Sequence, residues 1–179
     1  GLIFSVGFVN LYNFMDGLNG MMVGITISAL AIFALIDFFV VDFVDDLLLV
    51  YTAIPTLIFA FFNARRQAIC FAGDVGSIGI AFIMLFAIGK LIVQTGDVTY
   101  LIFLLVYGVD GCLTICHRIM LHENLGEAHR KHAFQLMANE LKIGHVKVTL
   151  LYMAMQLIVS LGFIYLCPNT ILAHWMYMI

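Results

Sequence analysis

Five long apolar runs, separated by short polar segments, restrict this chain to a bundle of helices that cross a membrane. Hydrophobic residues make up 64% of the 179 residues and charged residues only 11%, and the mean hydropathy is +1.09. Soluble domains carry about 25% charged residues, whereas runs of about 20 apolar residues span a bilayer as helices. The predicted spans are residues 17–38, 47–62, 75–95, 98–116 and 146–167.

Two shorter apolar segments flank these spans. Residues 1–14 have the composition of the end of another helix, and residues 170–179 are too short to cross, which predicts an interfacial stub. The predicted fold class is therefore all-α, a polytopic transmembrane helix bundle with about five full spans plus the end of another. The chain begins inside an apolar run without a methionine or a signal peptide. We expect residues 1–179 to be the C-terminal part of a single integral-membrane domain whose N-terminal spans are missing.

The charges predict how the bundle is oriented. One set of loops is acidic, with Asp37, Asp42, Asp45, Asp46 and Asp97. The other set carries nearly all basic residues, namely Arg65, Arg66, Arg118, Arg130, Lys131, Lys142 and Lys147. Because Lys and Arg accumulate in cytoplasmic loops, the basic side is predicted to face the cytoplasm. The basic residues are scattered and no aromatic residues are interleaved with them, so nothing indicates nucleic-acid binding.

The first polar segment on the basic side covers residues 10–20. Asn10, Asn13 and Asp16 follow a spacing of three and lie across one broad face of a helix end. Gly17 and Gly20 permit a turn or a close approach. Amides beside a carboxylate are suited to a polar ligand, bound directly or through a metal. The alternative is a water-capped helix end with Asp16 as a turn residue. Polar groups that enter a span favour the functional interpretation.

The second segment reads Phe-Ala-Gly-Asp-Val-Gly-Ser over residues 71–77 and opens the third span. A helix N-terminus attracts phosphate because its N–H groups point outward and carry partial positive charge. Asp74 can be the N-cap of that helix or can hold Mg²⁺ beside a substrate phosphate. The presence of Asp16 on the same side favours the metal. The preceding Arg65 and Arg66 are interpreted as topology anchors.

The third segment, residues 117–145, contains five of the six histidines. His129, Arg130 and His132 form its densest group of hydrogen-bond donors, which suits a diphosphate. A zinc site and a solvated basic loop are the alternatives. Apolar residues recur at helical spacing over residues 133–141 and predict an interfacial amphipathic helix.

Asp110 lies inside the fourth predicted span. Helical rise places it about 9 Å from the end of that span on the basic side. A buried pair with a basic residue such as Arg118 would give Asp110 a structural role. A functional role is the equal alternative, because carboxylates inside a span are functional candidates.

These motifs, in this order, resemble one family over nearly the whole chain. The polyprenyl-phosphate N-acetylhexosamine-1-phosphate transferases (glycosyl transferase family 4) share the pattern of residues 10–20, residues 71–77, Asp110 and the His129-Arg130-x-His132 motif. The histidine loop looks closer to the branch that initiates O-antigen and capsule than to the phospho-MurNAc-pentapeptide translocase. The family has about ten spans and an earlier cytoplasmic Asp-Asp pair. Asp45 and Asp46 form such a pair in this chain, but they lie in an acidic loop on the opposite side. The cytoplasmic pair is therefore missing, and this fragment alone is expected to be inactive.

The resemblance implies a Mg²⁺-dependent phosphoglycosyl transferase, with Mn²⁺ as a substitute metal. Undecaprenyl phosphate would attack a UDP-N-acetylhexosamine at the cytoplasmic face of the bacterial inner membrane and release UMP. The implied catalytic residues are Asp16, Asp74 and His129, with Asp74 and Asp16 at the metal. The implied substrate-binding residues are Asn10, Asn13, Gly17, Phe71, Arg130 and His132. The implied partners are the two substrates and the lipid bilayer, with a homodimer as an open alternative.

An ion- or proton-coupled membrane transporter is the main competing class, and a non-catalytic membrane scaffold is the third. Transporters place their sites near the bilayer midplane, in broken helices and often across two repeats. Here the polar segments share one side and no internal repeat is visible. The sequence therefore favours the transferase, without indicating which sugar it transfers.

Overall fold

The computed structural model describes residues 1–124, 131–168 and 170–178, which fold into helices only. Five segments of these residues are long and apolar enough to cross a membrane, so the chain is a multi-pass membrane protein by its helix composition. The predicted all-α fold is confirmed. The elements in chain order are α1 (Leu2–Met15), α2 (Met21–Phe39), α3 (Asp46–Asn63), α4 (Gly73–Thr95), η1 (Val98–Leu104), α5 (Leu105–Met120), α6 (Ala133–Asn139), α7 (His145–Leu166) and α8 (Ile171–Met178).

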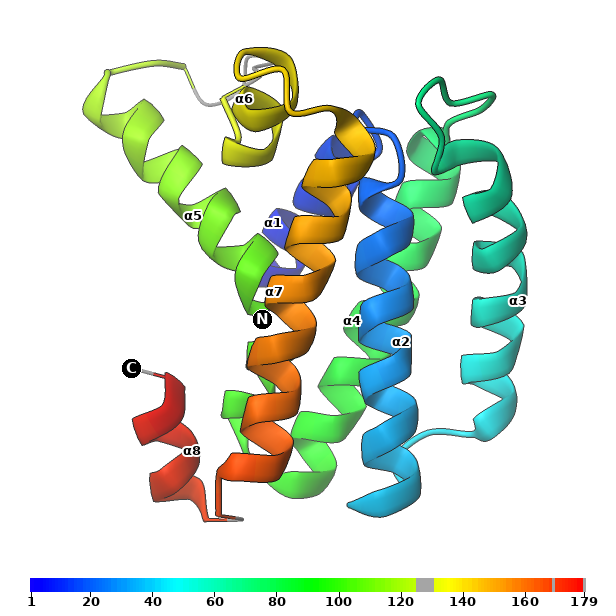
Figure 1. Cartoon of the computed structure of the whole chain (residues 1–179). Coiled ribbons are helices and arrows are strands. Elements are labelled where there is room, and N and C mark those ends of the chain that lie inside the picture. The colour runs from blue at the N-terminus through cyan, green and yellow to red at the C-terminus, as the bar shows by residue number, and fades with distance from the viewer. Residues whose placement is uncertain (125–130, 169, 179) are drawn as a thin grey trace.

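The bundle has two ends that differ in what they carry (Figure 1). The connections from α1 to α2, from α3 to α4 and around α6 lie together, and we name this the α6 end. The connections from α2 to α3, from α4 to η1 and from α7 to α8 lie at the opposite end, named the α8 end. The described parts of the three polar segments are thus at one end of the molecule, as the sequence predicts.

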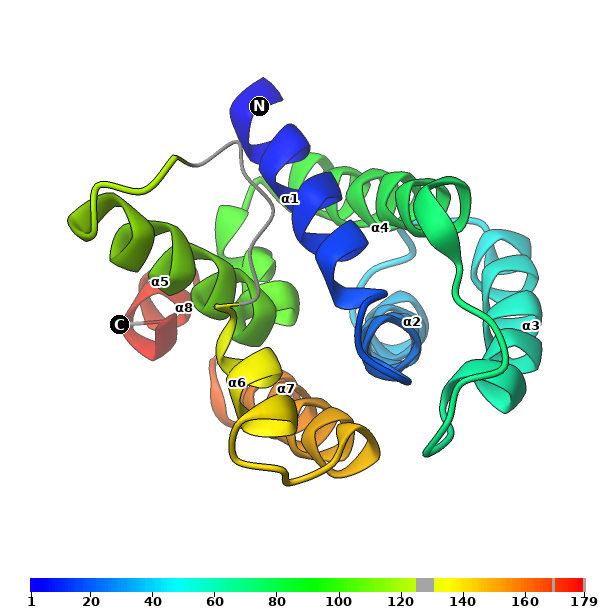
Figure 2. The same ribbon diagram turned by 90° about the horizontal axis from the view of Figure 1, so that it is seen from above.

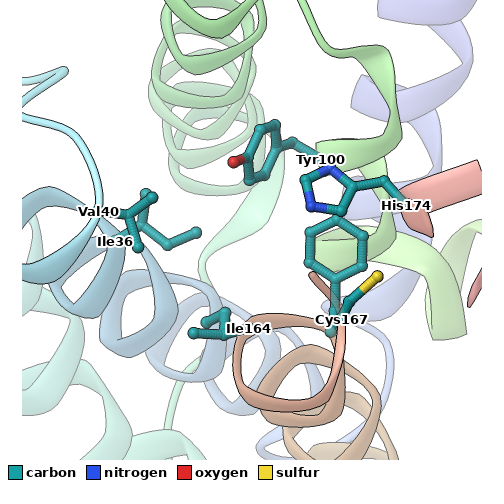
Figure 3. A pocket seen from close by; sticks show the side chains of 7 residues that line it. Ile36, Val40, Tyr100, Ile164, Cys167 and His174 are labelled. Atoms are coloured by element: carbon teal, nitrogen blue, oxygen red, sulfur yellow. The ribbon is translucent and has the colours of Figure 1, made fainter. Parts of the chain in front are cut away.

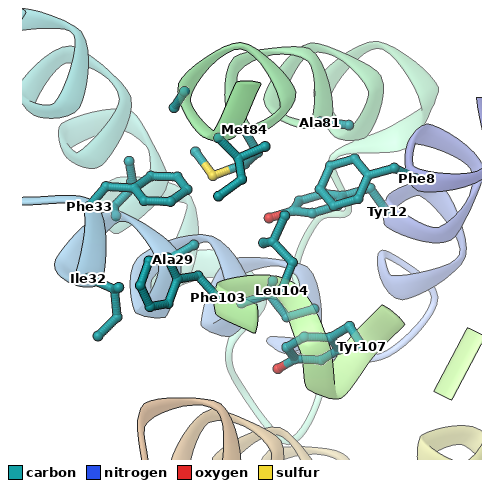
Figure 4. Close-up of a cluster of buried hydrophobic side chains, with 14 of the residues drawn as sticks. Phe8, Tyr12, Ala29, Ile32, Phe33, Ala81, Met84, Phe103, Leu104 and Tyr107 are labelled. Carbon is teal, nitrogen blue, oxygen red and sulfur yellow. The ribbon is translucent and has the colours of Figure 1, made fainter. Parts of the chain in front are cut away.

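The long helices surround α2, which lies in the middle of the bundle when it is seen from above (Figure 2). In its most apolar window 61% of the residues are buried, against 22% for α3. Figure 4 shows the core beside it, where Phe8 and Tyr12 of α1 and Phe33 of α2 meet side chains of α4, η1 and α5. The outward faces of the other helices are largely apolar, as lipid contact requires.

Gly24 allows α2 to approach α7 closely. A Cβ atom added at this position would lie 2.7 Å from the Met153 sulfur and 2.9 Å from the Thr149 methyl carbon. We therefore expect Gly24→Ala to destabilise the protein by about 1–3 kcal/mol through overpacking, measured as a lower Tm in detergent. Gly79→Ala on α4 is the matched control, because a Cβ there meets nothing within 4 Å. Equal Tm values for the two variants would contradict the close packing.

The fourth predicted span differs from the observed one in two respects. Its first part, η1, is a 3₁₀ helix, and α5 continues to Met120, four residues beyond the predicted end. From η1, α5 slants away from α7 toward the α6 end (Figure 1). The predicted C-terminal stub is α8, which packs against η1.

Asp97 connects α8 to the bundle. It is buried and accepts hydrogen bonds from His174 Nδ1 at 2.5 Å, the Thr99 hydroxyl at 2.6 Å and the Thr99 N–H at 2.9 Å. A cavity of about 100 Å³ lies beside the pair, where Ile36 of α2 and Val40 directly after that helix face Tyr100 and His174 (Figure 3). The sequence did not reveal this contact because 77 residues separate its two partners.

We expect the docking of α8 to weaken in acid. Burial raises the pKa of the Asp97 carboxyl, but hydrogen bonds from His174 and Thr99 outweigh it and hold the pKa below its ordinary value of 3.8. A carboxyl with a depressed pKa in the folded state stabilises the fold above its unfolded pKa, and that contribution is lost as the pH falls through the folded pKa. Proteolysis near the C-terminus should accelerate below pH 3.8 in the wild type. It should be faster at neutral pH and depend less on acid in Asp97→Asn, and identical pH profiles would contradict this.

Candidate active site

The carboxylate of Asp16 joins the end of α1 to the start of α4. Asp16 is only 7% exposed, and its two oxygens accept hydrogen bonds from the N–H groups of Ala72 at 3.1 Å and Gly73 at 2.8 Å. These are donors of the kind that a helix N-terminus leaves without an intrahelical partner. The alternative prediction that Asp74 is the N-cap is wrong, because Ala72 holds that position and Asp16, at the end of α1, supplies the acceptor.

A second contact joins the same two helices one turn away. The Ser77 hydroxyl donates to the Asn13 side-chain oxygen at 2.8 Å and shares its proton with the Gly73 carbonyl at 2.9 Å. Of the predicted shared face, Asn13 and Asp16 thus contact α4, whereas Asn10 is exposed. Gly17, directly after Asp16, is exposed as well.

Asp74 and Phe71 are exposed beside this buried contact. Asp74 is in the first turn of α4 and directly follows Gly73, which has a φ of +62°. Phe71 is 53% exposed. The buried carboxylate of Asp16 thus fixes the backbone from which an exposed carboxylate and an exposed aromatic ring project. This arrangement offers oxygen ligands and an apolar surface next to a helix N-terminus.

Two asparagines that sequence reasoning did not assign to the site fix the connection between α3 and α4. The Asn19 side-chain amide donates to the carbonyl oxygens of residues 65 and 66 at 2.9 and 3.0 Å. Asn63 accepts from the Gly20 N–H at 2.7 Å and donates to the Cys70 carbonyl at 2.9 Å. Gly20 has a φ of +82°, a left-handed conformation that favours glycine. The position of Asn19 directly before this glycine was the available signal.

Asp110 is at the centre of a second buried cluster at the α6 end. This side chain of α5 is 6% exposed. One oxygen lies 3.0 Å from His132 Nδ1, and the other accepts from the Ala133 N–H at 2.9 Å and the Tyr152 hydroxyl at 3.1 Å. The cluster therefore connects α5 to the start of α6 and to α7. Tyr152 was not predicted, because a tyrosine inside a span gives no signal by itself.

Asp110 does pair with a basic side chain, but the partner is His132 and not Arg118, which was the example that the sequence offered. Arg118 lies two helical turns further along α5, about 12 Å away along the axis, and forms an ion pair with Glu123 at 3.3 Å. Asp110 is correspondingly farther from the end of its helix than the predicted span implied, because α5 ends at Met120.

The two clusters meet through aromatic rings. The rings of Phe14, two residues before Asp16, and His132 have centroids 5.7 Å apart. His132 also stacks on Phe134 at 5.2 Å with an interplanar angle of 11°. The predicted site residues His129 and Arg130 lie outside the described residues. The structure thus brings six of the predicted site residues to the α6 end of the bundle: Asn13, Asp16, Gly17, Phe71, Asp74 and His132.

The carboxylates of this site are compatible with a magnesium ion whose coordination shell is completed by the substrate. Within residues 1–124, 131–168 and 170–178, no group of three His, Cys, Asp or Glu side chains could hold a metal. Mg²⁺ keeps several waters and binds one or two carboxylates together with substrate phosphates. The exposed Asp74 can supply one carboxylate. Because both oxygens of Asp16 already accept N–H groups, its predicted role as a metal ligand stays a prediction.

A comparison with known protein families shows which family the chain belongs to. The profile of glycosyl transferase family 4 matches residues 1–92, just over half of the 179 residues. The chain belongs to glycosyl transferase family 4. Membership implies a transferase that moves a phospho-sugar to a polyprenyl phosphate, and the family is generally Mg²⁺-dependent. No curated protein and no solved structure matches the chain. The matched part of this family 4 transferase contains Asp16 and Asp74, whereas Asp110 and His132 lie beyond it.

Proposed function

We propose that this transferase moves N-acetylhexosamine-1-phosphate from a UDP-sugar to undecaprenyl phosphate at the cytoplasmic face of the bacterial inner membrane. A phosphate oxygen of the lipid forms a bond to the β-phosphorus, the bond from that phosphorus to the bridging oxygen breaks, and UMP leaves with the electron pair. The product initiates an envelope polysaccharide, with O-antigen and capsule as the favoured pathways. One observation carries the proposal. Asp16 accepts hydrogen bonds from two backbone N–H groups at the start of α4, directly beside the exposed Asp74.

Asp74 is the residue that we assign to Mg²⁺. When bound, the ion would offset the repulsion between the two anionic substrates and stabilise the charge that develops on the transferred phosphoryl group. Asp16 positions the first turn of α4, whose N–H groups and helix dipole favour phosphate. Its direct contact with the metal or the nucleotide is part of the same proposal.

The remaining predicted residues are assigned to the substrates. Asn10, Asn13 and Gly17 line the nucleotide side, and Phe71, which is exposed, stacks on uracil. His132 contacts the diphosphate, together with His129 and Arg130. The apolar grooves between the spans hold the prenyl chain.

The test measures UMP release by the protein expressed from its complete gene, in detergent with undecaprenyl phosphate, Mg²⁺ and UDP-N-acetylglucosamine or UDP-N-acetylgalactosamine. We expect release that requires both the lipid phosphate and the metal. UMP release that is independent of the lipid would contradict the transfer. Ion- or proton-coupled flux into proteoliposomes without UMP release would favour the transporter instead.

A further inference from the structure

The two oxygens of Asp110 have different partners. Oδ1 accepts from the Ala133 N–H and the Tyr152 hydroxyl, so it fixes the first turn of α6 against α7. Oδ2 faces His132 Nδ1 at 3.0 Å. Because each oxygen has its own partners, a change at Oδ2 alone can alter the orientation and the tautomer of His132 while the contacts of Oδ1 remain.

The histidine ring is also constrained by packing. His132 is 2% exposed, and the rings of Phe14 and Phe134 lie against it. A carboxylate can only accept hydrogen bonds, so Asp110 places the proton of the neutral ring on Nδ1 and the lone pair on Nε2. The pair therefore sets both the plane of the ring and its tautomer.

We propose that Asp110 is a positioning residue of the transferase, which acts on the reaction by fixing the tautomer and the orientation of His132. This inference rests on the proposed function, because His132 is assigned there to the diphosphate. Partners of this kind, one bond removed from a reacting group, commonly change activity 10- to 100-fold when they are replaced. Replacing an aspartate that orients a histidine by asparagine leaves the geometry in place but imposes the wrong tautomer.

The decisive variant is Asp110→Asn. Asparagine keeps an oxygen for Ala133 and Tyr152 but presents an NH₂ group to His132, which then must accept at Nδ1 and carry its proton on Nε2. We expect kcat for UMP release to fall about 10- to 100-fold, with KM for the UDP-sugar changed less than about threefold. Asp110→Glu, which restores a carboxylate, should recover part of the loss.

Asp97→Asn is the matched control. It removes the same kind of contact, a buried carboxylate on a histidine Nδ1, at the α8 end of the molecule. We expect its kcat per folded protein to stay within about twofold of the wild type. If both variants lose activity equally, Asp110 contributes only to folding and the inference is overturned.

Two measurements separate this inference from the proposed function. Nitrogen-15 NMR of the histidine rings, with His132→Ala for assignment, should show His132 protonated at Nδ1 in the wild type and at Nε2 in Asp110→Asn. Adding Asp110→Asn to His132→Ala should cost less than about twofold more activity, because coupled residues are non-additive. A tautomer change without loss of kcat, or an additive double variant, overturns the inference. A wild-type protein that releases no UMP overturns the proposed function itself.

Discussion

Replacement of Asp74 by asparagine is expected to lower UMP release about 100- to 1,000-fold. The proposed role of this carboxylate is to hold the ion that offsets charge on the transferred phosphoryl group, and losing one such stabilising contact costs that much in kcat. Asp74 is exposed, so the substitution should leave the Tm and the detergent elution profile unchanged. The measurement is Mg²⁺-dependent release of UMP at saturating lipid phosphate.

The matched control for this variant is Asp46→Asn. Asp46 is also an exposed aspartate in the first turn of a membrane-spanning helix, but it lies at the α8 end. Its turnover should remain within about twofold of the wild type. Full turnover in Asp74→Asn would remove Asp74 from the metal site, and equal losses in both variants would point to a general effect of charge on the membrane protein.

The second large effect is expected from Asp16→Ala. The change leaves the N–H groups of Ala72 and Gly73 without their acceptor, which costs about 1–3 kcal/mol of stability. It also releases the backbone that carries Asp74, and a displacement of about 1 Å at a reacting centre can cost about 100-fold in rate. Both the Tm and the UMP release should therefore fall.

Asp37→Ala separates these two consequences. Asp37 accepts from the Phe43 and Val44 N–H groups at 2.8 and 3.0 Å, the same kind of contact at the α8 end. This control should lose a similar amount of stability while its turnover per folded protein stays within about twofold. If the Asp16 variant loses stability but keeps its turnover, Asp16 has no part in positioning the site.

The helices could be predicted from the sequence because the membrane leaves the chain few choices. A long apolar run in lipid must satisfy its own backbone hydrogen bonds, and a helix does so within one segment. For this reason α2 and α3 begin and end close to the predicted spans 17–38 and 47–62. The location of the polar segments at one end could also be predicted, because nearly all basic residues lie in the loops of that side.

The partners of the buried polar groups were decided only by the tertiary structure. Helical periodicity relates residues three or four apart on one helix, but it contains no information on which neighbouring helix a face will meet. Asp16 meets α4 across 56 residues, and Asp110 meets His132 and Tyr152 rather than Arg118 on its own helix. The amino-acid order thus determined the spans, their likeness to family 4 and the end that carries the polar residues. Packing determined which carboxylate caps a helix, which one holds a histidine and which one remains exposed, because those outcomes depend on donors brought close by other helices.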